Sequence, residues 1–326
     1  MASKKNPIER VVDGIDSWQQ RHRWLAFPYA VIKKYGDDEA GYQGALITYY
    51  VFLSLFPLLI VATSVIRIIG AHNQHLQEKL FASINNYFPS FGADLQTSIH
   101  TSSRSGWALA IGLLITFYGA RGGAEAVRHA VNHVWEVPKQ DRAGFPKGLL
   151  KNLVLILGGG IGFLGAAILS SYATAAFAHS FWLRALPIFA SFVMLLAVFT
   201  FVFRVASSAK RSWHELLPGA AVAAVGLQIL QTVGGYLITH QLSRLDGAYG
   251  RFGLVLAILF WIYLQAQVFL YAAEINTVHT LKLYPRSITQ SPLTAADRKA
   301  FELYAKRETY KAPPEDVKVH FHNEKS

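Results

Sequence analysis

The sequence contains no cysteine and little charge, with only 16% charged residues in a chain of 326. The absence of cysteine excludes disulfide bonds, thiolate catalysis and metal sites built on cysteine ligands. A soluble domain usually carries about 25% charged residues, so few residues here can coat a water-facing surface. Residues 1–43 also lack the apolar run and cleavage site of a signal peptide, so we expect the first long apolar segment to act as an uncleaved signal-anchor.

Apolar sequence is abundant, because 52% of the residues are hydrophobic. A membrane helix needs about 20 mainly apolar residues. Five segments reach that length, and they are residues 44–69, 149–177, 181–206, 216–238 and 252–277. A shorter apolar stretch, 107–119, runs into the mixed helical pattern of 120–135, and we expect it to be a sixth span whose cytoplasmic end projects from the bilayer.

The basic residues alternate in the way that membrane insertion predicts. Of the 31 arginines and lysines, 25 lie before the first span, after the last span or in alternate connections, and five lie in the remaining connections. This asymmetry places both termini in the cytoplasm of a cell with a cytoplasmic (inner) membrane, and it supports the short second span. It also explains the net charge of +11 without nucleic acid, so we predict no nucleic-acid partner.

The predicted fold is therefore all-α, a polytopic membrane protein with six transmembrane helices plus interfacial helices. Residues 1–43 form a cytoplasmic amphipathic region, 44–278 the transmembrane domain, and 279–326 a charged cytoplasmic tail. The domain includes an outer loop, 70–105, with one or two short helices, and a cytoplasmic loop, 120–148. The tail is expected to be helical near 295–311 and disordered over about its last 15 residues.

The N-terminal region has apolar residues at helical spacing among basic neighbours. They are Ile8, Val11, Val12, Ile15, Trp18 and Trp24. Such a pattern is typical of a helix that lies on a membrane surface, so membrane lipids are expected partners.

The glycines of the third span match GxGxxG at Gly160, Gly162 and Gly165. A dinucleotide site needs a strand before this motif, and here the glycines sit inside an apolar span. Small residues recur four apart at Gly158, Gly162, Ala166 and Ser170, so we predict close packing of another helix against this face.

Glu125, His129 and His133 lie four apart and share a predicted helix face. Two such histidines can bind a metal, but the ligand set is incomplete and there is no HExxH pattern. We expect surface or packing roles, with metal binding as the alternative, and we predict no metal and no cofactor.

Polar residues and a proline interrupt the first span at Thr48, Tyr49, Ser54 and Pro57. Pro57 frees the carbonyl of Leu53 and bends the helix, and Ser54 could satisfy part of the freed backbone. The pattern fits either a structural kink or a kink that lines a cavity or forms a gate.

Polar side chains also occur within spans five and six, at Gln228, Gln231, Gln265, Gln267, Tyr271 and Glu274. The last three share one helix face. Such groups are costly in hydrocarbon, so they indicate either hydrogen bonds between helices or a polar cavity between the two spans. An arginine such as Arg204 or Arg121 is the expected partner of Glu274.

Several motifs resemble the YihY/BrkB family of inner-membrane proteins. They are ALITYYVFLSLFPLL at 45–59, AVNHVW at 130–135, WHELLPGA at 213–220, YGRFG at 249–253, WIY at 261–263 and AEIN at 273–276. They occur in order at matching topological places from about residue 30 to 285. The YGRFG form is most similar to the YhjD branch, whereas Ala273 departs from the glycine that is common before the glutamate, which concerns packing only.

This resemblance implies six spans, cytoplasmic ends and a role in envelope integrity, and the YhjD-like branch suggests movement of a lipid or glycolipid across the inner membrane. We hypothesise a transport protein rather than an enzyme. The residues expected to line its substrate path are Tyr49, Ser54, Pro57, Arg121, Gln228, Gln231, Gln267 and Glu274. Pro57 would form a gate in the path. Tyr49 and the glutamines would form hydrogen bonds with the head group of the substrate, and Arg121 and Glu274 would contact its charge.

Two other hypotheses remain open at the level of the sequence. The protein could be a non-transporting scaffold, either a homo-oligomer or one that binds envelope-assembly partners. A membrane-bound hydrolase or nuclease is weaker, although family members have been named ribonuclease BN, because a nuclease normally needs a carboxylate or histidine cluster that holds a metal in water.

Overall fold

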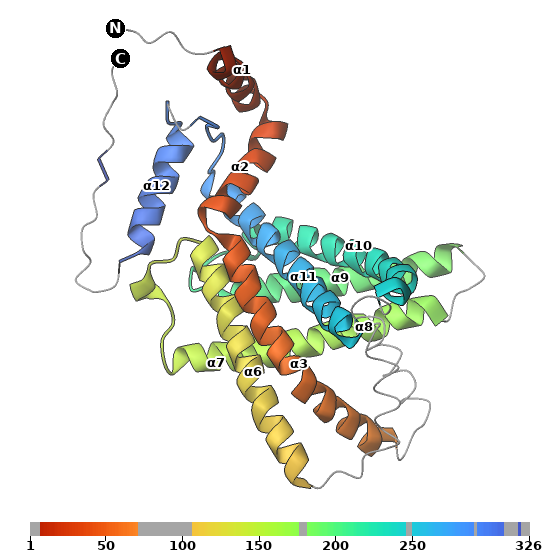
Figure 1. Ribbon diagram of the computed structural model, residues 1–326. Helices are drawn as coiled ribbons and strands as arrows, with labels where there is room; N and C mark the ends of the chain where they lie inside the picture. The colour runs from red at the N-terminus through yellow and green to blue at the C-terminus, as the bar shows by residue number, and fades with distance from the viewer. Residues whose placement is uncertain are drawn as a thin grey trace.

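The computed structural model describes residues 7–70, 106–175, 181–245, 250–289, 292–309 and 319–320 of the chain. All of the secondary structure in these ranges is helical (Figure 1). The elements are α1 (Pro7–Arg21), α2 (Arg23–Asp37), α3 (Ala40–Gly70), α6 (Gly106–Val134), η1 (Lys139–Asp141), α7 (Lys147–Val154), the π-helical turn η2 (Leu155–Gly159), α8 (Gly160–Ala175), α9 (Phe181–Ala206), α10 (Trp213–Leu245), α11 (Gly250–Leu281) and α12 (Ala295–Arg307).

Four helical segments among the described residues are long and apolar enough to cross a membrane. They are Lys147–Leu169, Ile188–Ala206, Trp213–Gln231 and Val255–Leu281, and they coincide with predicted spans three to six. The first two predicted spans fall in α3 and α6, which are continuous helices. The count of six spans remains a prediction, and the short helices expected within 71–105 lie outside the described residues.

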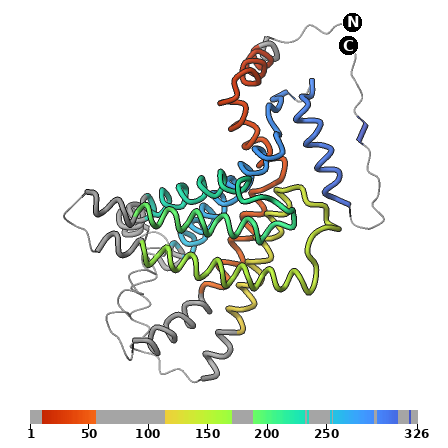
Figure 2. Tube along the Cα trace, turned by 180° about the vertical axis from the view of Figure 1, so that it is seen from behind, coloured from red at the N-terminus to blue at the C-terminus, as the bar shows by residue number. Residues whose placement is uncertain are grey.

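The long helices pack side by side through small residues. Helix α3 lies between α6 and α11, α10 lies between α11 and α9, and α8 pairs with α9 (Figures 1 and 2). A side chain placed at Gly158 of η2 would collide with Phe201 of α9, and one at Gly162 of α8 would collide with Val198 of α9. The predicted small-residue face is thus confirmed at these glycines, whereas the side chain of Ser170 lies outside the described residues.

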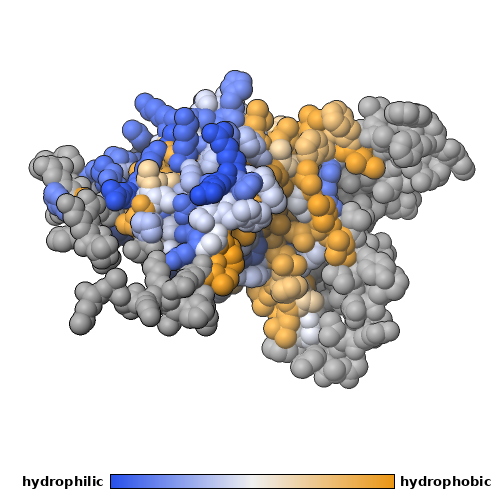
Figure 3. Space-filling model, turned by 90° about the horizontal axis from the view of Figure 1, so that it is seen from above, coloured by the Kyte–Doolittle hydropathy of each residue, from blue (hydrophilic) through white to orange (hydrophobic). Residues whose placement is uncertain are grey.

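Large apolar side chains cover one side of the molecule, and polar side chains gather on the other (Figure 3). Leu114, Ile161, Phe189 and Phe260 are each at least 60% exposed. A soluble monomer rarely exposes so much contiguous apolar surface. Together with the spans above, this distribution agrees with a protein whose helices face lipid.

Helices α1, α2 and α12 lie together at one end of the bundle (Figure 1). Ala30 and Val31 of α2 share a small core with Val278 of α11 and Ala300 of α12. Helix α12 begins at a capping box in which Thr294 and Asp297 bond each other's backbone, a device that contributes about 1 kcal/mol. The described part of the tail is therefore packed against the membrane domain.

Candidate functional site

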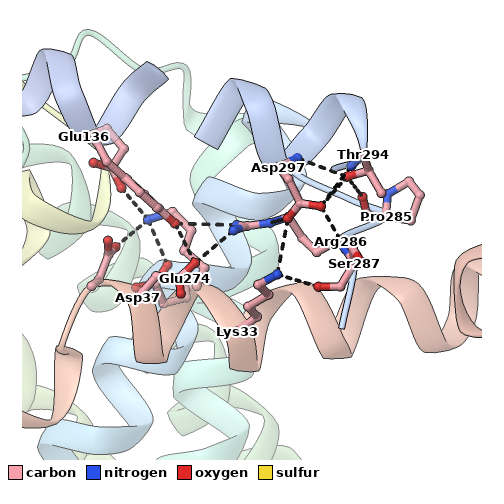
Figure 4. Close-up of polar contacts among 12 residues, drawn as sticks. Lys33, Asp37, Glu136, Glu274, Pro285, Arg286, Ser287, Thr294 and Asp297 are labelled. Atoms are coloured by element: carbon pink, nitrogen blue, oxygen red, sulfur yellow. Dashed lines mark hydrogen bonds and ion pairs between the residues drawn. The ribbon is translucent and has the colours of Figure 1, made fainter. Parts of the chain in front are cut away.

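Buried charged side chains meet where α2, α11, α12 and the end of α6 come together (Figure 4). Lys34 of α2 is fully buried. Its Nζ donates hydrogen bonds to Glu136 Oε1 at 2.8 Å and to the Val134 carbonyl at 3.0 Å, and it also bonds Asp38 one turn along α2. The same ammonium lies 3.4 Å from Glu274 Oε2 of α11.

Arg307, in the last turn of α12, supplies the second cation of this group. Its Nη1 lies 2.9 Å from Asp38 Oδ1 and 3.1 Å from Glu136 Oε2. We call Lys34, Asp38, Glu136, Glu274 and Arg307 the junction cluster. Lys34 and Asp38 come from α2 and its end, whereas the other three members come from the end of α6, from α11 and from α12. The cluster therefore fixes the N-terminal and C-terminal helices to the membrane domain.

Local geometry explains how Glu136 reaches the cluster. Helix α6 ends at Val134, and Glu136 adopts a left-handed backbone conformation with φ of 54°. That conformation is uncommon for a residue with a side chain and costs on the order of 1 kcal/mol. The turn directs the Glu136 carboxylate back toward Lys34 instead of onward into solvent.

Burial and charge shift the pKa values in the cluster in opposite directions. Burial lowers the pKa of Lys34, but Asp38, Glu274 and Glu136 outweigh it and hold that pKa well above its ordinary value. Burial raises the pKa of Glu136 to about 7, and Lys34 only partly opposes this. Burial also raises the pKa of Asp38, yet Lys34 and Arg307 reverse the shift and keep it low.

A second buried group lies beside the junction cluster (Figure 4). Arg286 is fully buried and donates through Nε to Asp297 Oδ1 and through Nη2 to Asp37 Oδ2 at 2.9 Å. The Lys33 Nζ lies 3.3 Å from Asp297, and the Ser287 amide donates to the other oxygen of the same carboxylate. This group holds α12 against α2 and the segment that follows α11.

The carboxylate of Asp16 ties helix α1 to that same segment. Asp16 accepts hydrogen bonds from the Ser287 hydroxyl at 2.9 Å and the Ile288 amide at 3.0 Å. The bond fixes the rotation of α1, and it leaves Val11, Ile15 and Trp18 more than half exposed.

The structure corrects the expected partner of Glu274. Neither Arg204 nor Arg121 pairs with it, because Lys34 occupies that place. Arg204 instead donates to the carbonyl of Arg211 and stacks over Trp213. Arg121 is exposed on α6.

The predicted polar face of α11 is confirmed, but it meets α2 and α3. A side chain at Gly44 of α3 would lie 3.0 Å from the Gln267 amide, and Tyr271 stacks on Tyr35 of α2 with ring centroids 4.0 Å apart. The residue of α11 that faces α10 here is Val268, which contacts Gly226. The Gln267 amide therefore lies against α3, and the contacts do not indicate a cavity that Gln267 shares with the half-buried Gln228 and Gln231 of α10.

The other predicted path residues lie on the α3–α6 pair. Tyr49 is 56% exposed, and Ser54 is half-buried against Gly119. The Ser54 hydroxyl donates to the Val51 carbonyl at 2.8 Å, and not to the carbonyl of Leu53 that Pro57 is expected to free. Pro57 falls where the side chains of α3 lie outside the described residues, so its kink remains a prediction.

Glu125, His129 and His133 do share a helix face, but their contacts are divided. Glu125 accepts hydrogen bonds from Arg128 Nη2 at 2.6 Å and Asn152 Nδ2 at 2.7 Å, whereas His129 contacts Gln43 of α3. Within the described ranges, no three His, Asp or Glu side chains gather as a metal site. Glu125 and His129 thus make packing contacts, and the expected absence of a metal stays a prediction.

Sequence reasoning missed most of the junction cluster and the Arg286 group. The spacing of Lys34 and Asp38 is a local signal, because residues four apart in a helix can pair. No such local signal exists for Glu136, Arg307 or Arg286. Some of their partners lie more than one hundred residues away in the sequence, and others lie in the C-terminal tail, whose charged composition predicts exposure to solvent.

Comparisons with known proteins agree with this architecture. The model of the family described as Virulence factor BrkB matches residues 31–296. The chain is 24% identical to the putative ribonuclease-like protein YfkH of Bacillus subtilis over 80% of this chain and 98% of that protein. It is 25% identical to the inner membrane protein YhjD of Escherichia coli over 78% of this chain and 81% of that protein.

A UPF0761 membrane protein of Psychrobacter sp. is 24% identical over 81% of this chain, which spans about half (51%) of that longer relative. No solved structure matches the chain.

Proposed function

The chain belongs to the virulence factor BrkB family of membrane proteins, and we propose that it moves a lipid or glycolipid across the cytoplasmic membrane to maintain the cell envelope. We further propose that both termini face the cytoplasm and that the protein acts without an enzymatic step. The E. coli relative is named an inner membrane protein, which supports the proposed location.

The observation that carries the proposal is a polar stripe on the exposed face of α6. Tyr118, Arg121, Glu125 and His129 follow one another at intervals of three and four residues, and all four are exposed. Leu114, which lies one turn closer to the apolar end of α6, is 70% exposed. The stripe thus leads from the polar end of the helix into its apolar surface, and we call it the α6 stripe.

A stripe of this kind suits a substrate with a charged head group and apolar tails. An arginine guanidinium binds phosphate through several parallel hydrogen bonds. A head group could move along the α6 stripe while its acyl chains stay in the bilayer, so the full cost of dragging charge through hydrocarbon is avoided. Tyr49 on the adjacent helix α3 offers a further hydroxyl on the exposed surface.

The roles of the predicted path residues are revised accordingly. Arg121 and Tyr49 retain head-group contact in this proposal. Gln228 and Gln231 remain candidates for head-group contact or for hydrogen bonds between helices, and Pro57 remains a candidate gate. Glu274 and Gln267 are assigned to helix packing, because they face α2 and α3.

Purified protein in vesicles tests the proposal. Vesicles would carry a fluorescent phospholipid in both leaflets, and a membrane-impermeant reductant would bleach only the outer leaflet. We expect wild-type protein to expose inner-leaflet lipid to the reductant, and we expect Arg121→Gln to slow this at least tenfold. Arg204→Gln is the matched control, because Arg204 is also an exposed arginine but lies at the end of α9. Equal rates for the two variants would reject the α6 stripe as the path.

One observation favours a scaffold as the second candidate function. The junction cluster and the Arg286 group hold α2 and α12, and Asp16 holds α1, in a layer on the membrane domain that would suit docking of an envelope-assembly partner. Deleting residues 290–326 would not separate the two functions, because it would remove Asp297, a partner of buried Arg286, together with the rest of α12. A deletion of residues 310–326 leaves α12 intact. If this variant moved lipid normally in vesicles but failed to support the envelope in cells, the result would favour the scaffold.

A further inference from the structure

We infer that the junction cluster is a proton-binding site, in which Glu274 and Glu136 hold one exchangeable proton between them. This inference goes beyond lipid movement and does not depend on it. It rests on the number of charges in the cluster, on their burial and on which carboxylate lacks partners.

The charges of the junction cluster do not balance. Three buried carboxylates, from Asp38, Glu136 and Glu274, face the two cations Lys34 and Arg307 among the residues that the structure describes. A fourth carboxylate, that of Glu308, also lies 3.5 Å from Arg307, but it is half exposed and is paired with Lys139. The side chains of the three buried carboxylates and of Lys34 are at most 1% exposed, and that of Arg307 is 11% exposed. An unbalanced charge in so dry a place is far more costly than in water, so a neutral cluster that retains one proton is favoured.

The contacts indicate which carboxyl group holds that proton. Asp38 and Glu136 each contact both Lys34 and Arg307. Glu274 contacts only Lys34, at 3.4 Å, and its oxygens accept no hydrogen bond from the described residues. Glu274 is therefore the main holder and Glu136 the second.

The other titratable groups around the cluster do not restore the balance. His133, at the end of α6, has its pKa lowered to about 4 by burial and by Arg307, so it is neutral near pH 7. Burial and neighbouring acidic groups raise the pKa of Tyr35 on α2 and of Tyr304 on α12, so both phenols stay neutral. Arg286 pairs with Asp37 and Asp297 in the neighbouring group.

Loss of the proton would place one uncompensated negative charge where α2, α6, α11 and α12 meet. The repulsion is relieved when the helices separate and water enters the cluster. Protonation therefore favours the closed junction, and a rise in pH favours an open one. The site provides a direct link between proton binding and the position of α11, a predicted span.

Infrared spectroscopy of the purified full-length protein tests this inference. A protonated carboxyl group in a dry site gives a C=O stretching band that an ionised carboxylate lacks. We expect wild-type protein to show this band at pH 6 and to lose it by pH 9. Labelling glutamate with carbon-13 should shift the band, because the proton resides on glutamate and not on aspartate.

Two variants make the result decisive. Glu274→Gln imitates the protonated side chain and balances the cluster, so the band should disappear and proton release between pH 6 and 9 should fall by one per molecule. Glu302→Gln on the exposed surface of α12 is the matched control and should behave like wild type. If Glu274→Gln fails to fold, the spectrum of the labelled wild-type protein still shows whether a buried glutamate is protonated. A band that is absent at pH 6, insensitive to glutamate labelling or unchanged in Glu274→Gln would overturn the inference.

Discussion

Lys34 of α2 and Glu274 of α11 lie 3.4 Å apart with both side chains fully buried. The pair joins a helix that precedes the first predicted span to the end of the last one. Buried ion pairs contribute little net stability, because desolvation offsets their attraction. Removing one partner is costly, however, so the pair acts as a constraint on how the helices are arranged.

Lys34→Met should therefore destabilise the protein strongly. The change leaves three buried carboxylates with one cation, and breaking a buried pair typically costs about 3–5 kcal/mol. Thermal unfolding of the purified protein, followed by loss of its monodisperse elution, would measure this. Lys282→Met is the control because Lys282 is exposed, and it should change the midpoint little. Similar midpoints for the two variants would show that Lys34 does not anchor the junction.

Stability should fall as the pH rises from about 5 toward about 8. The pKa of Glu136 is raised from 4.5 to about 7 in the folded protein, mainly by burial. Between these values the unfolded chain has lost the proton that the folded chain still holds, so the folded state binds more protons and loses stability as pH increases. Unfolding midpoints of wild type and Glu136→Gln across this range would test it. The slope should flatten in the variant, and parallel curves would contradict the assignment.

The packing of α10 on α11 should be sensitive to a single methyl group. A Cβ at Gly219 would collide with the Ala272 carbonyl and the Asn276 amide. The Ala272 carbonyl belongs to the backbone of α11, so it cannot move aside without shifting the helix. We expect Gly219→Ala to destabilise by about 1–3 kcal/mol. Gly160→Ala is the control, since nothing lies within 4 Å of its Cβ position, and it should be neutral or slightly stabilising. Equal unfolding midpoints would show that α10 and α11 are not in close contact there.

Helix α1 should lie on the membrane surface with one defined face. Asp16 holds its rotation, so Ile15 is expected to face lipid and Ser17, on the opposite side, to face water. Because the native sequence has no cysteine, single spin labels can be placed at Ile15→Cys and Ser17→Cys without background. Label 15 should be accessible to oxygen but not to a water-soluble nickel relaxant, and label 17 the reverse. Nickel access at 15 would place α1 in water, and access by neither relaxant would indicate a protein contact.

The four spans that coincide with long apolar helices could be predicted from the sequence, because hydrocarbon selects for long apolar segments and this signal is local. The glycine face of α8 was predictable for the same reason, since its spacing alone puts small residues together. The junction cluster could not be predicted, because a charged residue in a polar segment is expected to face solvent unless its partner in the fold is known. Lys34 and Arg307 stand more than 270 residues apart in sequence but share the carboxylates Asp38 and Glu136.

Movement of lipid between leaflets by the purified wild-type protein is the most direct test of the proposed function. Vesicles that contain the protein should expose nearly all of the fluorescent phospholipid to a membrane-impermeant reductant. Protein-free vesicles should keep their inner leaflet protected, and heat-inactivated protein should behave like them. Inner-leaflet protection that persists with folded protein, for phospholipid and glycolipid probes alike and at pH values on both sides of 7, would contradict lipid movement and leave the scaffold as the better explanation.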